Sequence, residues 1–373
     1  MNASLEKPFV GELFFVRAIA CLSVVCLHAI SLMYLTYNPT PAETRWVQVF
    51  QMLFMFATPL FVCISEFLLA YSYPDRIPRG FWKRRIQYIL LPFVFMGGLY
   101  AFVYKQTWPE RLERFMDMVF AAQWHGYFVL IIFQFYVIHT WWIRRGKKWP
   151  LRKGVFWAFA INFGYLFIIF LLRMQQVTLD GWMQHHHLIF PAWIFYFAVG
   201  YYAGVYFDEF KAFVTKYSKW ILTGTAGYAF LVAFIKYAGW IPWTASKRFD
   251  ILPYTILMLC ALYYLATRMK EIPSWVILIS HTSYGIYLLH PIVMGKLLKE
   301  TLLPDGLPFA IFFVVMFTGG VIIPFLVTYI LNQLPYGAYL VGKLGKSRKS
   351  ITNRRTTANA YYRIFSLHRS LVV

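Results

Sequence analysis

Residues 10–34 read VGELFFVRAIACLSVVCLHAISLMY, and this stretch predicts the fold of the chain. It is long and apolar enough to cross a bilayer as a helix, which takes about 20 residues. Arg17 and His28 are eleven positions apart, about 20° more than three full helical turns, so both lie on one face, roughly 16 Å apart. Ionisable side chains at this depth normally face a bundle interior and mark a site. The structural alternative is that Arg17 extends to the interface and His28 bonds a neighbouring helix.

Composition places the whole chain in the same class. Of 373 residues, 60% are hydrophobic and only 14% are charged, which is typical of a polytopic membrane protein and excludes an ordinary soluble domain. The apolar runs are helix-length and lack the short alternating pattern of barrel strands. We therefore predict an all-α, polytopic membrane helical bundle of about ten transmembrane helices. The predicted spans are 10–34, 46–71, 86–104, 124–143, 154–172, 188–207, 219–237, 250–267, 275–295 and 308–331.

The distribution of Lys and Arg predicts the orientation. Residues 76–85 hold five of them and residues 144–153 hold six, so both loops are expected in the cytoplasm. Alternate loops then carry 25 basic residues inside and 10 outside, with Arg17 in its helix completing the 36. Both termini are predicted to be cytoplasmic. Residues 1–335 form the predicted membrane domain, and residues 336–373 a basic cytoplasmic tail, either lipid-associated or partly disordered.

The net charge of +21 follows largely from this asymmetry. Anionic headgroups of the lipid bilayer are the expected partner of such loops, and nucleic acid is not required. Within the second predicted span, Glu66 reaches the level of Arg17. An ion pair between them would satisfy both charges, and we favour this structural role for Glu66 over direct catalysis.

A second motif lies in the predicted span 275–295. Residues 283–291 read SYGIYLLHP and place His290 near the same membrane surface as His28. Together with the Arg17 to His28 spacing, this string resembles the acyltransferase-3 family of integral membrane O-acyltransferases. The resemblance covers residues 8–331 and is closest to the Gram-positive branch that includes intercellular-adhesion polysaccharide modifiers. Further matching segments are Ser65–Leu69, Phe81–Arg85 leading to Pro92 and Phe93, Tyr127 with Phe128, and Phe195–Gly204.

The resemblance implies transfer of an acyl group, acetyl or another short one, from cytoplasmic acyl-CoA to a hydroxyl of an extracytoplasmic acceptor. The acceptor would be a surface polysaccharide or a lipid-linked sugar, and the location the bacterial plasma membrane. Acyl-CoA is the donor substrate, and no permanently bound cofactor is expected. Lys83, Arg84 and Arg85 are candidates to hold the donor phosphates, or they only set the topology. Many family members have Arg-x-x-Arg here, whereas Tyr88 follows Arg85 in this chain.

His28 is the candidate general base, because an imidazole with a pKa near 6.5 can take the proton of an attacking hydroxyl. Arg17 would guide the donor arm or stabilise local negative charge. His290 either orients the acceptor or only caps its helix, and Tyr287 is a further candidate beside the acceptor. No metal site is predicted, because the histidines expected near the outer surface lack carboxylate or thiolate partners at ligand spacing. These histidines are His125, His185, His186 and His187.

The alternative function is a polysaccharide exporter or flippase. A transporter should contain broken helices near the midplane and a wide polar pathway. Gly285, Gly319, Gly320 and Pro324 supply helix-breaking residues, but polar midplane residues are too few for a glycan-sized channel. The sequence therefore favours the enzyme.

Overall fold

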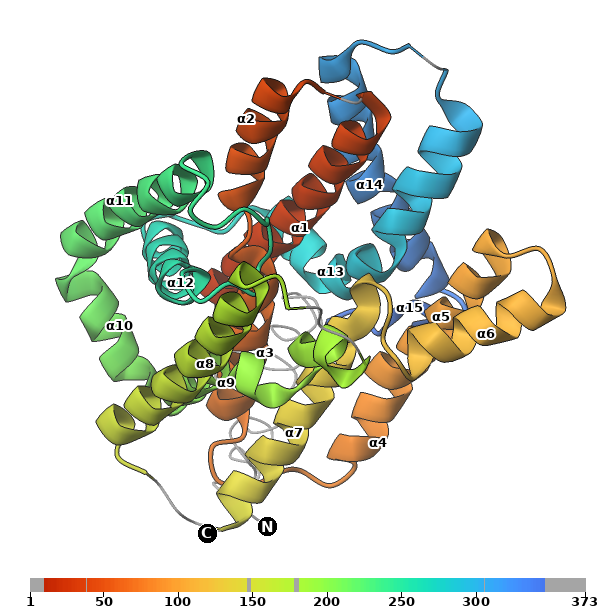
Figure 1. Cartoon of the computed structure of the whole chain (residues 1–373). Helices are drawn as coiled ribbons and strands as arrows, with labels where there is room; N and C mark the ends of the chain where they lie inside the picture. Colours follow the sequence, from red (N-terminus) through yellow and green to blue (C-terminus); the bar gives the residue numbers. More distant parts are fainter. Residues whose placement is uncertain (1–9, 38, 146–148, 178–180, 305, 346–373) are drawn as a thin grey trace, which may run out of the picture.

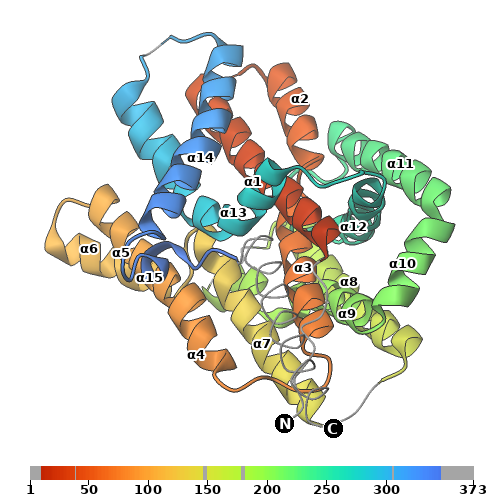
Figure 2. The same cartoon turned by 180° about the vertical axis from the view of Figure 1, so that it is seen from behind.

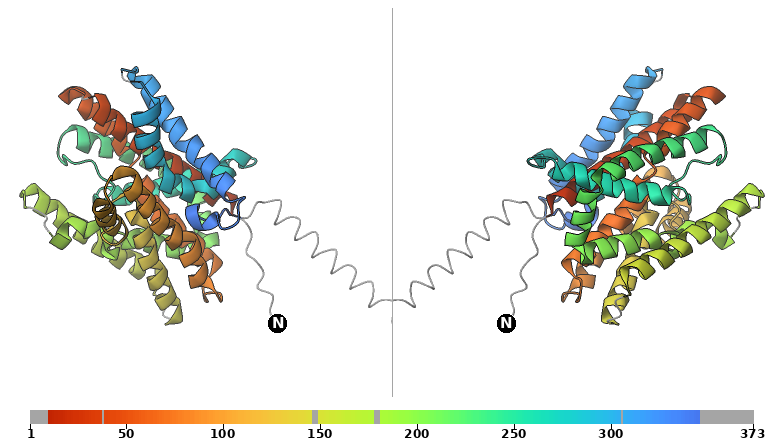
Figure 3. Two further views of the ribbon diagram at one scale, coloured as in Figure 1. Left: turned by 90° about the vertical axis from the view of Figure 1, so that its right-hand side faces the viewer. Right: turned by 90° about the vertical axis from the view of Figure 1, so that its left-hand side faces the viewer.

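The computed structural model describes residues 10–37, 39–145, 149–177, 181–304 and 306–345. Helices and connecting loops make up these residues, and they contain no strand, which confirms the all-α prediction. Figures 1 and 2 place α1 (Gly11–Tyr37) and α3 (Ala57–Ser72) in the middle of the molecule. The side views of Figure 3 show the long helices inclined in similar directions, as in a helical bundle.

The remaining elements surround this centre. They are α2 (Pro41–Met52), α4 (Phe81–Arg85), the π-helical η1 (Ile86–Leu90), α5 (Leu91–Tyr104), α6 (Trp108–Val119), η2 (His125–Tyr127), α7 (Phe128–Arg144), α8 (Leu151–Met174), η3 (Gly181–Leu188), η4 (Phe190–Ala192), α9 (Ile194–Val205), α10 (Phe207–Lys216), α11 (Ser218–Tyr237), α12 (Ile251–Thr267), α13 (Ser274–Ile292), the π-helical η5 (Val293–Leu302), α14 (Phe309–Leu331) and α15 (Ala338–Val341).

Each of the ten predicted spans coincides with an apolar helix of the bundle. Among the described residues, eight helical segments are long and apolar enough to cross a membrane, where directly connected elements such as α2 with α3, or α13 with η5, count as one segment. The other two, α9 and α12, are shorter, with 12 and 17 residues. Both have largely buried side chains, so they line the interior of the bundle. The chain is therefore a multi-span membrane protein.

Small residues explain how α9 lies against α3. A Cβ added at Gly200 would meet the Cys63 carbonyl oxygen at 2.3 Å, and one at Gly204 would meet the Phe67 carbonyl oxygen at 2.5 Å. The two helix backbones are therefore in direct contact. Close approach at small residues replaces hydrophobic burial as the source of helix association inside a membrane.

The structure adds helices outside the predicted spans, and α6 is the longest of them. Helix α6 carries five charged residues among twelve and begins at Thr107, whose side chain forms a capping box with Glu110. It packs against α5 at the edge of the bundle (Figure 1). Its strongly amphipathic pattern is typical of a helix at a membrane surface.

The structure locates the two predicted cytoplasmic loops and the start of the predicted tail. Residues 75–83 and the end of α7 line one groove, so the two basic loops predicted to be cytoplasmic do lie at one end. From the predicted tail, Val341 is fully buried beside Met96 and Leu289, and Asn332 donates to the Gly342 carbonyl at 3.0 Å. The rest of that tail, residues 346–373, lies outside the described residues.

Candidate active site

Helices α1 and α13 pack side by side and carry the two polar motifs at matching levels. At one level Arg17 donates from Nε to Ser280 Oγ at 3.0 Å and from Nη2 to the Ser280 carbonyl. At the other level the rings of His28 and His290 lie 4.9 Å apart. Arg17 and His28 both contact α13, as expected for two residues that share one helix face. Arg17 bonds protein groups there and does not extend to the interface.

A third histidine completes the site at the His28 level. The His125 ring lies 5.6 Å from that of His290 and 6.2 Å from that of His28, between ring centroids. We call these three residues the histidine cluster. Helices α1 and α13 and the short segment η2 contribute one histidine each. Among the described residues, no group of three or more His, Cys, Asp and Glu side chains is placed to hold a metal ion.

Pro291 explains why His125 belongs to the cluster. A proline inside a helix has no N–H, so the carbonyl four residues earlier loses its helical partner. In α13 that carbonyl belongs to Tyr287, and His125 Nε2 donates to it at 3.1 Å. The Tyr287 hydroxyl donates in return to the His125 carbonyl. His125 therefore satisfies a backbone group that would otherwise be unpaired inside the membrane.

The next carbonyl is satisfied in a similar way. The hydroxyl of Tyr100, from α5, accepts from the Ile292 N–H and donates to the Leu288 carbonyl, both at 3.0 Å. This hydroxyl is inserted between two groups that would bond each other in a regular helix. Two residues distant in sequence, Tyr100 and His125, thus hold the end of α13 and with it His290.

Burial separates the roles of the clustered rings. His290 is fully buried, and its Nδ1 donates to the Ile286 carbonyl at 3.0 Å. Since that nitrogen carries the proton in the neutral ring, Nε2 holds a lone pair, and it has no hydrogen-bond partner among the described residues. His28 is half-buried. Of the three rings, those of His28 and His125 are partly exposed, and that of His290 is not.

The predicted ion pair between Glu66 and Arg17 is wrong. Glu66 Oε1 lies 2.6 Å from Nδ1 of His139 on α7, and His139 Nε2 lies 3.3 Å from the Tyr73 carbonyl. Both ring nitrogens of His139 thus have an oxygen partner inside the bundle. Glu66 is 2% exposed and His139 0%. The partner of Glu66 comes from α7, because Arg17 turns toward α13.

The three basic residues predicted to bind the donor separate in the structure. Lys83 lines a groove of about 360 Å³ together with Arg76, Arg79, Trp82 and Arg144. Arg84 is not among the lining residues, and its Nη1 donates to the Arg79 carbonyl at 3.3 Å.

Arg85 turns away from this groove. Its guanidinium lies 4.9 Å from the ring of Phe81 and 4.8 Å from that of Tyr136. We call the set Arg76, Arg79, Trp82, Lys83 and Arg144 the basic groove.

Sequence reasoning missed three residues of this region. His125 was grouped with the histidines of the outer loops, and Tyr100 and Ser280 were not singled out. Pro291 is the signal that could have led to His125 and Tyr100, because a proline inside a membrane helix requires substitute donors. The sequence could not say which residues supply them.

Comparison with known proteins agrees with this architecture. A family model described as an acyltransferase domain, acyltransferase-3, matches residues 11–329. YfiQ of Bacillus subtilis (strain 168), whose name describes a membrane-bound acyltransferase, is 33% identical over 348 residues, which are 90% of this chain and 95% of that protein. A protein of Staphylococcus aureus (strain Mu50), whose name describes poly-β-1,6-N-acetyl-D-glucosamine export, is 24% identical over 78% of this chain and 84% of that protein. No solved structure matches the chain. The chain therefore belongs to the acyltransferase-3 family and is a membrane acyltransferase.

Proposed function

We propose that this membrane acyltransferase moves a short acyl group from acyl-CoA to a hydroxyl of a glycan or lipid-linked sugar, with His28 as the general base. The observation that carries the proposal is the histidine cluster: a half-buried imidazole lies 4.9 Å from a fully buried one. The buried ring of His290 and the backbone-bonded ring of His125 lie next to His28.

The reaction needs a base because a hydroxyl is a weak nucleophile at neutral pH. His28 takes the proton of the acceptor hydroxyl as its oxygen attacks the thioester carbonyl. The carbon–sulfur bond then breaks, the acyl group stays on the acceptor oxygen as an ester, and the CoA thiolate takes up a proton. A positioned general base typically contributes about 10²–10⁴-fold to the rate of such a step. Tyr287 positions His125 through its hydroxyl and does not enter the chemistry.

The basic groove is the proposed binding site for the nucleotide part of acyl-CoA. Four cations, one carboxylate (Asp75) and the indole of Trp82 line one groove, and the excess of cations suits phosphates next to an aromatic base. Arg17 lies between the groove's end of the bundle and the histidine cluster, roughly 16 Å along α1 from His28. We assign Arg17 to guiding the donor arm toward His28.

The positive-inside asymmetry supports placing the groove on the cytoplasmic side of a bacterial plasma membrane, with both termini inside. The acceptor would then approach the histidine cluster from outside. Names of staphylococcal relatives that refer to poly-β-1,6-N-acetyl-D-glucosamine support a glycan acceptor.

Purified protein in lipid nanodiscs, given radiolabelled acetyl-CoA and oligomers of N-acetylglucosamine, tests the proposal. We expect label in the oligomers and stoichiometric release of CoA thiol. His28→Gln should lower turnover by about 10²–10⁴-fold, because an amide cannot accept a proton near neutral pH. Normal transfer by the Gln variant would refute the base assignment.

The donor site is tested separately with a matched pair of substitutions. Lys83→Gln removes a lining cation of the basic groove and should raise the KM for acetyl-CoA with kcat nearly unchanged. Arg84→Gln, one residue away and outside the lining, should leave KM unchanged. If both substitutions changed KM equally, Lys83 would contribute only to the membrane topology.

A second candidate function, glycan export, rests on the names of the staphylococcal relatives alone. The charged groups inside the bundle are bound to partners, Arg17 to Ser280 and Glu66 to His139, which disfavours a polar pathway for a glycan. Movement of labelled N-acetylglucosamine oligomers across the membrane of sealed vesicles that contain the protein, without acyl transfer in the nanodisc assay, would favour this candidate.

A further inference from the structure

A small cavity lies between α8, η3 and the loop 238–250. Its volume is about 100 Å³. Because about 10–15 Å³ of such space holds one water molecule, it is large enough for several waters or for one phosphate group. Its polar lining comes from Arg173, His186, Lys247 and Arg248, and its apolar lining includes Trp243 and Phe249.

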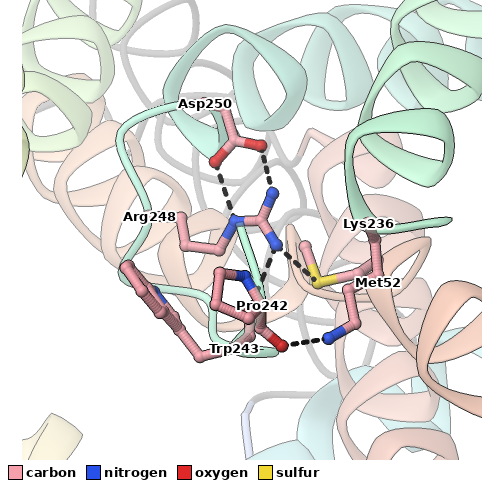
Figure 4. Close-up of polar contacts among 6 residues, drawn as sticks. All are labelled: Met52, Lys236, Pro242, Trp243, Arg248 and Asp250. Carbon is pink, nitrogen blue, oxygen red and sulfur yellow. Dashed lines mark hydrogen bonds and ion pairs between the residues drawn. The ribbon is translucent and has the colours of Figure 1, made fainter. Parts of the chain in front are cut away.

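The loop that forms one wall is fixed by buried polar contacts (Figure 4). Arg248 donates to both carboxylate oxygens of Asp250, at 2.9 and 2.6 Å, and to the Trp243 carbonyl at 3.1 Å. Lys236 donates to the Pro242 carbonyl. Since Arg248 and Asp250 are 2% and 6% exposed, their charges neutralise one another inside the protein. This wall of the cavity is held in place before any ligand binds, and Asp250 already neutralises the charge of Arg248.

Arg173 and Lys247 are different, because they meet aromatic faces. The Lys247 ammonium lies 4.7 Å from the centre of the Tyr127 ring, and the Arg173 guanidinium lies 5.6 Å from that of Trp243. No carboxylate is among the described residues that line the cavity. Burial, together with the nearby Arg173 charge, lowers the pKa of Lys247 to about 8. Two like charges held close together at a partly buried cavity are unfavourable unless an anion joins them.

We propose that Arg173 and Lys247 form a binding site for a phosphate group carried by the acceptor. A phosphate monoester bears about −1.5 to −2 charges at pH 7, which matches two cations better than a single carboxylate does. Arginine can bind two phosphate oxygens at once, and lysine adds a point charge.

The position of this cavity links it to catalysis. Lys247 contacts Tyr127, which is two residues from His125 and begins the turn into α7. The Tyr127 ring also lies 4.9 Å from that of His187. The cavity is thus joined to the histidine cluster through the short segment 125–127, and we place a sugar attached to a phosphate in the cavity along this segment. This step rests on the proposed function and assigns the acceptor a phosphate, either on the glycan or on a lipid carrier.

Protection of Lys247 from chemical modification tests the site without an acyl donor. The protein in nanodiscs is treated with the neutral reagent N-acetoxysuccinimide, and modification of each lysine is followed by peptide mass spectrometry. Lys299, a lysine outside the cavity lining, serves as the internal reference. The probes are N-acetylglucosamine 1-phosphate, farnesyl phosphate and inorganic phosphate, with N-acetylglucosamine as the uncharged control.

We expect a phosphate probe at about ten times its Kd to slow Lys247 modification about tenfold, since the free fraction falls in that proportion. Lys299 should be unaffected. Arg173→Gln should abolish the protection, and Arg173→Lys should keep most of it. Protection by the sugar phosphate indicates a glycan-borne phosphate, and protection by farnesyl phosphate alone a lipid carrier.

Three outcomes overturn the proposal: equal protection by N-acetylglucosamine, no protection by any phosphate, or protection by inorganic phosphate alone. Unchanged protection in Arg173→Gln also overturns it. Because the assay contains no acyl-CoA, a failure of acyl transfer leaves its result intact. Conversely, acyl transfer without Lys247 protection would contradict only the phosphate site.

Discussion

The bond from His125 to the Tyr287 carbonyl should exist because Pro291 frees that carbonyl, and a double-mutant cycle tests this cause. His125→Phe keeps an aromatic ring and removes the donor that lies 3.1 Å from the carbonyl oxygen. An unsatisfied buried acceptor costs about 1–3 kcal/mol. Pro291→Ala restores an N–H that can donate to the same carbonyl in the regular helical pattern. In the Pro291→Ala background, His125→Phe should therefore lose most of this cost.

The free energy of unfolding of the four proteins, measured by SDS titration in mixed micelles with circular dichroism, gives the coupling energy. We expect roughly 1–2 kcal/mol, within the range of about 0.5–3 kcal/mol seen for residues in one network. Changes in ring packing cancel, because they occur in both backgrounds. As the control, Pro324→Ala in α14 should combine additively with His125→Phe. Additivity of the Pro291 pair within about 0.5 kcal/mol would refute the reasoning.

Three further predictions concern the bundle itself. Glu66→Gln breaks the buried pair of Glu66 with His139 and should reduce the free energy of unfolding by about 3–5 kcal/mol if that pair is ionic, measured in the same SDS titration; a loss below about 1 kcal/mol would argue against an ion pair. Gly200→Ala puts a Cβ 2.3 Å from a backbone oxygen and should strongly reduce the yield of folded protein, whereas Gly227→Ala, with no atom within 4 Å, should be neutral; equal yields would contradict the close α3–α9 contact. Reporter fusions after residues 110 and 245 should read as external, and a cytoplasmic signal from either would reverse the orientation.

Features that depend on local sequence could be predicted well. All ten predicted spans coincide with helices, because the length of an apolar run and helix periodicity are local properties. The shared face of Arg17 and His28 follows from the same helix geometry. Even the shortness of α9 reflects its sequence, since Pro191 and the residues around it form short 3-10 turns before the helix begins.

Pairing between helices could not be predicted in this way. Glu66 and Arg17 lie at the same depth in the membrane, but depth alone does not determine which residue each one contacts. The rotation of each helix about its own axis determines it, and helix packing sets that rotation. The contact of Gly200 with the Cys63 backbone brings α9 onto one face of α3. Glu66 meets His139 of α7, and Arg17 is left to bond Ser280.

The parallel course of α1 and α13 gives the site its particular geometry. Arg17 is eleven residues before His28, and Ser280 is ten residues before His290, so contacts at both levels fix the rotation of each helix about its axis. Two contacts separated by three turns leave little freedom for one helix to turn against the other. Under the proposed function, this matters because the donor enters at the level of the basic groove and the hydroxyl is activated at the level of His28. The contact between Arg17 and Ser280 also fixes the rotation of α1 at the level of His28. The His28 side chain can therefore keep its direction while acyl-CoA binds and leaves.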